Sequence, residues 1–337
     1  CSILFGEGKH SDIIHTLVSI SEYRRHVHRC RCIPDSEDIQ QGVNRDRVLG
    51  APQNGQPTAS AKVVALLEVT TVVGGVIIGY VLFHMHAPLA TWERITWGQR
   101  TLTKSTLFIM VPFLLLLLTK RTQSSYGLNP QKSSQQLQAA GVSLLVIGPA
   151  SMVFWLLRVL SLDYREWGGA AILALTYVGM LAFVVVLLKL WSAPVMLSVR
   201  RRRVYLWPVV IWAMACLCIP LLRKCDWYLL AVLVHILVAT GLGEELLFRG
   251  YVQSRLNEVF GRPFSCGGVQ WGIGLVVTAV LFGAIHVFNV SGTIAWAFWT
   301  VFAGLVYGFL REKTGGIIAP AIVHSVPLCI RAIMYYG

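Results

Sequence analysis

Five ionisable side chains that could carry out acid–base chemistry lie in or beside apolar stretches near the C-terminal end of the chain: Glu244, Glu245, Arg249, His286 and His324. Placing such a group in a membrane helix costs about 2.5 kcal/mol or more, so each is a functional candidate by default. A glutamate can take a proton from water, and an imidazole can orient that water or donate to a developing oxyanion. One glutamate with two histidines is also the ligand set of a catalytic zinc ion. The residues alone therefore predict hydrolysis and leave both mechanisms open.

The first of these motifs is a pair of glutamates after a glycine-rich turn. Gly241 and Gly243 are expected to break the preceding helix, so that Glu244 begins a new one, where acidic residues are favoured. Glu245 and Arg249 are four residues apart and share a helix face, so they are expected to pair. Glu244 is turned about 100° away and has no such partner, which leaves it as the candidate base. The alternative is that both glutamates are caps at the membrane surface.

The two histidines belong to separate apolar segments. Phe282 and His286 lie one helical turn apart, and His324 lies inside the last apolar segment. The alternative for each histidine is a buried, hydrogen-bonded core residue. His235 and Glu68 have no motif companions, and we expect both to be helix-packing or interface groups.

The elements that carry these residues are long and apolar. Of the 337 residues, 55% are hydrophobic and 13% are charged, and the mean hydropathy is +0.63. A soluble domain has about 25% charged residues, so the composition argues against a soluble enzyme, a disordered chain and a disulfide scaffold. Most apolar segments approach the ~20 residues that cross a bilayer, where the backbone must be helical. We predict an all-α, multi-pass transmembrane bundle of about eight to ten helices. The segments are 63–83, 104–119, 138–160, 170–191, 204–222, 226–243, 269–289, 293–310 and 316–335.

Three regions follow from this pattern. Residues 1–62 contain a stretch rich in Pro, Gln, Asn, Asp and Gly and are predicted to be disordered or loosely ordered. Residues 63–225 hold the N-terminal transmembrane helices, and residues 226–337 hold the predicted catalytic region. The net charge of +13 is attributed to loop topology and lipid headgroups, because no nucleic-acid-binding motif accompanies it. We expect an integral membrane protein, in the cell membrane or in an endomembrane of a eukaryote.

The motifs resemble those of the CAAX protease and bacteriocin-processing family of intramembrane proteases, also called Abi or CPBP. That family shows E-E-x-x-x-R, then F-x-x-x-H, then a histidine followed four residues later by Asn or Asp. Glu244 to Arg249 match the first pattern, Phe282 and His286 the second, and His324 the start of the third. The resemblance covers about residues 226–336.

The resemblance implies an endopeptidase in which Glu244 activates water and His286 orients it or shares its proton. His324 stabilises the oxyanion, and Glu245, Arg249 and Phe282 support the site. No cofactor is expected, and a zinc ion held by Glu244, His286 and His324 is the alternative. The sequence departs from the pattern at Leu328, where the family has Asn or Asp; Asn289 is a candidate substitute.

The expected partners are the lipid bilayer and a peptide or protein substrate, which in eukaryotic members is a prenylated C-terminus. Two other functions remain. One is a non-catalytic family member that acts as a scaffold or a bacteriocin-immunity protein, which Leu328 favours. The other is an ion-coupled transporter, because intramembrane Glu and His also serve proton relays. Transporters often contain an internal repeat, and residues 60–220 hold no second E-E-x-x-x-R.

Overall fold

The computed structural model describes residues 57–97, 99–129, 133–190, 227–289 and 291–336. The described residues belong to one compact unit. The predicted disordered segment 1–62, apart from its last residues, and the predicted apolar segment 204–222 lie outside the described residues.

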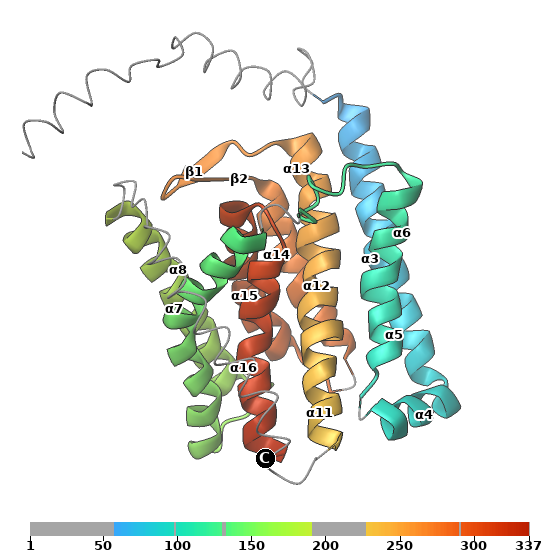
Figure 1. The fold of residues 1–337 in the computed structure, drawn as a ribbon, viewed down its shortest axis with the longest axis vertical. Helices are drawn as coiled ribbons and strands as arrows, with labels where there is room; N and C mark the ends of the chain where they lie inside the picture. Colours follow the sequence, from blue (N-terminus) through green and yellow to red (C-terminus); the bar gives the residue numbers. More distant parts are fainter. Residues whose placement is uncertain (1–56, 98, 130–132, 191–226, 290, 337) are drawn as a thin grey trace, which may run out of the picture. The chain divides into compact units, whose positions relative to one another are not determined.

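The described residues are almost entirely helical, which confirms the predicted all-α membrane bundle (Figure 1). The elements are α3 (Ala59–Met85), α4 (Ala87–Trp97), α5 (Thr101–Ser105), η1 (Thr106–Met110), α6 (Val111–Leu118), α7 (Ser133–Val159), α8 (Trp167–Leu190), α11 (Trp227–Val234), η3 (His235–Leu242), α12 (Gly243–Glu245), η4 (Leu246–Gln253), α13 (Ser254–Phe260), β1 (Phe264–Cys266), β2 (Val269–Trp271), α14 (Ile273–Ala284), η5 (Ile285–Phe288), α15 (Ile294–Thr314) and α16 (Ile318–Tyr336).

Six helices of the described part are long and apolar enough to cross a membrane. They span Ala59–Phe83, Thr101–Leu118, Trp167–Val186, Trp227–Phe260, Ile294–Thr314 and Ile318–Tyr335, and a shorter apolar helix covers Ile273–Phe288. Many of their large apolar side chains are exposed, whereas others pack between helices. The protein is therefore a multi-pass membrane protein.

The predicted helix break before Glu244 is wrong. Helix runs without interruption from Trp227 to Phe260, through the π-helical stretches η3 and η4. Gly241 and Gly243 serve close packing instead. A Cβ atom on Gly241 would lie 1.9 Å from the Ser325 hydroxyl oxygen of α16, and one on Gly243 would lie 3.3 Å from a side-chain carbon of η1. The glycines thus let two neighbouring helices approach the long helix at the level of Glu244.

The predicted helix 269–289 begins later than its apolar pattern suggested. Val269–Trp271 is strand β2, which pairs antiparallel with β1, and α14 begins only at Ile273. Gly267 and Gly268 both have positive φ, as a tight two-residue hairpin turn requires. The hairpin follows α13 and returns the chain into α14.

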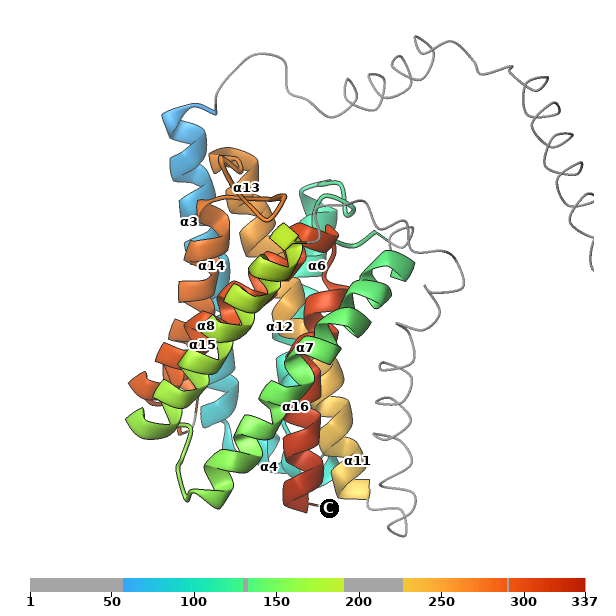
Figure 2. The same ribbon diagram turned by 90° about the vertical axis from the view of Figure 1, so that its left-hand side faces the viewer.

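Helices α7, α8, α14, α15 and α16 pack against one another, and the last three also contact the long helix. α14 packs on α15, α15 on α8, and α16 on both α7 and η3. Figure 2 shows α7 beside α16 and α8 beside α15. On its other side the long helix contacts α3, α5 and η1. Glu244 lies on this long helix, whereas His286 and His324 lie on η5 and α16, which both pack against α15.

Candidate active site

Three elements bring the predicted catalytic residues to one pocket. Glu244 lies on α12, His286 on the turn η5 and His324 on α16. All three line a pocket of about 760 Å³. Their exposed fractions are 6%, 8% and 6%, so each side chain reaches the pocket from a buried position.

Glu245 and Arg249 form the predicted ion pair. Arg249 Nη1 donates to Glu245 Oε1 at 2.9 Å, and both side chains are fully buried. The guanidinium also lies 4.3 Å over the ring of Phe282, and its Nη2 donates to the carbonyl of Gly304 at 3.1 Å. A buried ion pair is tolerated when further hydrogen bonds compensate the lost hydration. The contact with Gly304 provides such a hydrogen bond, and together with the contact with Phe282 it connects η4 to α14 and α15.

The prediction that Glu244 has no partner is wrong. Lys104 of α5 places its Nζ 2.5 Å from Glu244 Oε1 and also donates to the hydroxyl of Thr240 at 3.0 Å. Lys104 was not predicted as a site residue, because it stands at the start of an apolar segment, where a basic residue is an ordinary flank. Glu244 Oε2 is buried, has no hydrogen-bond partner among the described residues and lies 3.9 Å from His324 Nε2. One oxygen of Glu244 is therefore fixed, and the other is available to the pocket.

Both histidines are held through Nδ1. His286 Nδ1 lies 2.7 Å from the carbonyl oxygen of Phe282, one turn earlier in the chain. His324 Nδ1 lies 3.0 Å from Glu245 Oε1, and its ring stacks on Tyr307 with 4.8 Å between centroids. A carbonyl or carboxylate oxygen accepts hydrogen bonds, so we assign the Nδ1 proton in both rings. Nε2 is then the nitrogen left to act on a bound molecule.

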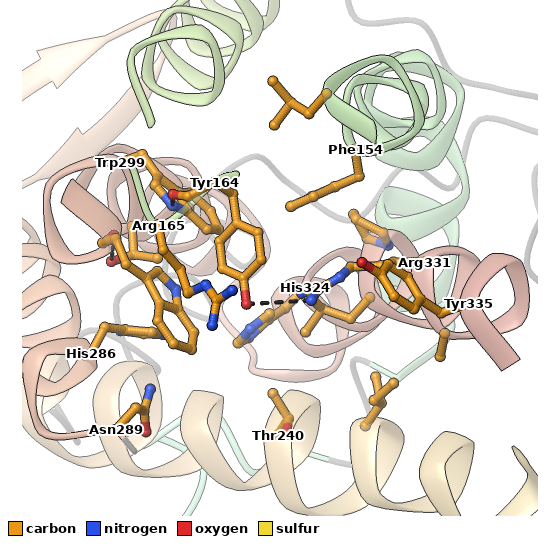
Figure 3. Close-up of a pocket in the computed structure, with 18 of the residues that line it drawn as sticks. Phe154, Tyr164, Arg165, Thr240, His286, Asn289, Trp299, His324, Arg331 and Tyr335 are labelled. Atoms are coloured by element: carbon orange, nitrogen blue, oxygen red, sulfur yellow. Dashed lines mark hydrogen bonds between the residues drawn. The ribbon is translucent and has the colours of Figure 1, made fainter. Parts of the chain in front are cut away.

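Leu328 supplies no polar atom where the resembling family has Asn or Asp. It lines the pocket one turn after His324 and packs against an apolar cluster of α11 and α16. The candidate substitute, Asn289, also lines the pocket and lies on the His286 side of it (Figure 3). No hydrogen bond from Asn289 to His324 is among the contacts of the described residues, so its role stays a prediction.

The zinc alternative requires ligand atoms that converge on one point. Within the described ranges, no group of three or more His, Cys, Asp or Glu side chains is arranged to hold a metal ion. One oxygen of Glu244 is already taken by Lys104. Zinc binding by Glu244, His286 and His324 stays a prediction that the chelation experiment tests.

The two ionisable residues outside the motifs are both helix-packing groups, as predicted. Glu68 accepts hydrogen bonds from Arg121 and from Arg255, the latter at 2.9 Å. This network links α3 to the segment after α6 and to α13. His235 is a helix-packing group, as predicted: its Nδ1 lies 3.1 Å from the hydroxyl of Thr101, which joins η3 to α5.

One end of the pocket is rich in arginine and aromatic side chains. Arg331 Nη2 donates to the hydroxyl of Tyr164 at 3.3 Å, a contact drawn in Figure 3. Nearby, Arg165 forms an ion pair with Asp163 at 2.5 Å. Hydrogen bonds from Arg165 are the main reason that the pKa of Asp163 lies below its usual value, and the charge of Arg331 lowers it further. Figure 3 shows the surrounding side chains: Phe154, Tyr164, Arg165, Trp299, Arg331 and Tyr335.

Residues 226–327 match the family described as type II CAAX prenyl endopeptidase Rce1-like. The match covers about a third of the chain, contains Glu244, His286 and His324, and confirms the family recognised from the motifs. No curated protein and no solved structure matches the chain.

Proposed function

We propose that this protein, whose residues 226–327 carry the Rce1-like region, is a membrane-embedded endopeptidase that uses water activated by Glu244. The observation that carries the proposal is the unequal use of the two Glu244 oxygens. Oε1 is held by Lys104, while Oε2 has no partner among the described residues and lies beside His324 in the pocket. A carboxylate held in this way is oriented for one task, which is to accept a proton from a water molecule.

In the proposed reaction, Glu244 Oε2 takes a proton from water while Nε2 of His286 orients the water. The oxygen of that water bonds to the carbonyl carbon of the substrate. His324 stabilises the resulting oxyanion through Nε2–H, and because its Nδ1–H donates to Glu245, this requires the imidazolium form. The proton on Glu244 then passes to the amide nitrogen as the C–N bond breaks, which yields a carboxylic acid and an amine.

A specific observation favours a second candidate, a non-catalytic family member. Leu328 is apolar and lines the pocket one turn after His324. In the resembling family an Asn or Asp at this position assists the histidine. A scaffold or bacteriocin-immunity protein could keep the fold and the buried ion pairs while having lost that polar group.

The test is hydrolysis of a peptide library, including prenylated C-terminal peptides, by the full chain in lipid vesicles. Glu244→Gln, His286→Ala and chelator-treated samples run in parallel. Activity that survives chelation and disappears in both variants supports the proposal. Activity that chelation removes and zinc restores contradicts the metal-free mechanism.

Leu328→Asn separates the two candidates. If the wild-type protein cleaves no peptide and Leu328→Asn does, the natural protein is the non-catalytic member. If wild type is active and Leu328→Asn increases kcat by no more than a few-fold, the site works without this residue.

A further inference from the structure

A second pocket lies between the β1–β2 hairpin and the last turn of α15, and none of the predicted catalytic residues lines it. Its volume is about 420 Å³, which is within the range of small-molecule sites. Two membrane-crossing helices end beside it, because the long helix ends at Phe260 and α15 ends at Thr314. The pocket is therefore at the level of the lipid headgroups and not in the hydrocarbon core.

The charged side chains of this second pocket are three cations and one carboxylate, Glu312. Glu312 Oε2 accepts a hydrogen bond from Arg262 at 2.6 Å, and its Oε1 accepts from two side-chain amides. Arg311 and Lys313 are the cations that remain, and neither forms an ion pair with a carboxylate of the described residues. The lining thus carries an excess of two positive charges.

Arg311 is the more informative of these two cations, because its charge is buried. The residue is 4% exposed. Its Nη2 donates to the carbonyl of Ser125 at 3.0 Å and to the hydroxyl of Ser254 at 3.2 Å, and its Nε has no hydrogen-bond partner among the described residues. Both acceptors are neutral, so they hold the guanidinium in place without balancing its charge. A buried charge is normally paired, because burial removes its hydration.

The helix dipole is the alternative reason for cations at this place. The last turn of a helix favours basic residues, because its free carbonyl groups carry partial negative charge. This effect accounts for Lys313, which is exposed at the end of α15. It gives no reason to bury Arg311 beside a cavity, because an exposed arginine would serve the dipole as well.

We infer that this second pocket binds a phosphate group, with Arg311 and Lys313 as its charge partners. Arginine binds phosphate oxygens through charge-assisted hydrogen bonds, and lysine binds them as a point charge. The phosphate group has two sources, the headgroup of an anionic phospholipid and phosphate dissolved in water. The position at the membrane boundary favours the lipid. The inference does not depend on the proposed function, since neither residue lines the pocket of Glu244.

The experiment measures the binding of phosphatidylglycerol and phosphatidylcholine, with the same acyl chains, to the full-length protein in detergent. Native mass spectrometry gives the fraction of protein that carries each lipid. Both lipids contain a phosphate, but choline neutralises its charge in phosphatidylcholine. We expect phosphatidylglycerol to bind at least about tenfold more tightly.

Arg311→Gln and Lys313→Gln are each expected to reduce this preference about fivefold by weakening phosphatidylglycerol binding alone. Arg311 is buried, so its variant can fail to fold. Lys313 is exposed, and its variant decides the question by itself. Lys120→Gln removes an exposed lysine that does not line this pocket and is the matched control, with no change in preference expected.

Inorganic phosphate separates the two sources of the phosphate group. Its binding is followed as a rise in the unfolding temperature of the same protein in detergent. If phosphatidylglycerol is preferred and inorganic phosphate gives no rise, the occupant is a lipid headgroup. If the two lipids bind equally and inorganic phosphate stabilises wild type but not Lys313→Gln, the occupant is dissolved phosphate.

Equal binding of the two lipids without any effect of inorganic phosphate overturns the inference. A lipid preference that Lys313→Gln leaves unchanged also overturns it. So does a preference that Lys313→Gln and Lys120→Gln reduce equally, because net charge alone then attracts the lipid. Peptide hydrolysis enters none of these measurements, so each of these outcomes leaves the proposed function standing.

Discussion

Glu68 and Glu244 are two carboxylates within membrane helices, and they differ in how many donors they receive. Both oxygens of Glu68 accept hydrogen bonds. Glu244 is bonded through Oε1 alone, and its Oε2 has no partner among the described residues. A fully bonded carboxylate holds helices together, whereas a half-bonded one that faces a pocket is available for chemistry. The donors to Glu68 are Arg121, Tyr251 and Arg255.

Glu244→Gln is expected to have the largest effect, which is a loss of activity. The amide oxygen still accepts from Lys104, so the fold should persist, but the side chain can no longer take a proton from water. We expect kcat to fall by about 10⁴-fold, the upper range for general acid–base groups. The rate of peptide hydrolysis by the variant and by wild type in lipid vesicles measures this loss. If Glu244→Gln keeps more than a tenth of the wild-type activity, Glu244 is not the base. The difference in hydrogen bonding between Glu244 and Glu68 would then not reflect a role in catalysis.

Arg249→Met is expected to give the largest loss of stability. It leaves Glu245 as an uncompensated buried charge, which costs about 3–5 kcal/mol. Unfolding of the purified protein in detergent, followed by circular dichroism, measures the change. The double variant Glu245→Leu/Arg249→Met removes both charges and should recover most of the stability. It should not recover activity, because His324 loses its Nδ1 partner. Recovery of both would show that Glu245 is structural only.

Glu68→Gln should affect stability and not chemistry. It weakens two ion pairs at a site whose carboxylate is 21% exposed, so we expect a loss of about 1–2 kcal/mol. Activity per folded molecule should stay within about twofold. Glu258→Gln is the matched control, since among the described residues Glu258 forms one ion pair, with Arg255, and is more exposed; its cost should be below about 0.5 kcal/mol. A tenfold loss of kcat in Glu68→Gln would contradict the division of roles.

The sequence sufficed for features that depend on local spacing. The four-residue interval between Glu245 and Arg249 predicted their pair, and the apolar segments predicted the membrane bundle. Features that depend on contacts between distant segments were missed. Lys104 and Glu244 are 140 residues apart, and no periodicity links them. Gly241 was expected to end a helix, because its sequence pattern does not reveal that α16 packs directly against it.

The smaller of the two expected losses of kcat is that of Lys104, which acts through Glu244 and not on the substrate. Lys104→Met removes the hydrogen bond that fixes Oε1 and frees the carboxylate to rotate, so we expect kcat to fall about 10- to 30-fold, with KM nearly unchanged. Lys104→Arg keeps a cationic donor and should recover kcat to within about threefold. Lys120→Met removes a positive charge that lies just beyond α6 and is the matched control, with no change expected. If Lys104→Met lowers stability but leaves kcat intact, the lysine only compensates a buried charge. In that case orientation of Glu244 comes from its own helix, and the half-bonded carboxylate needs no partner to act as a base.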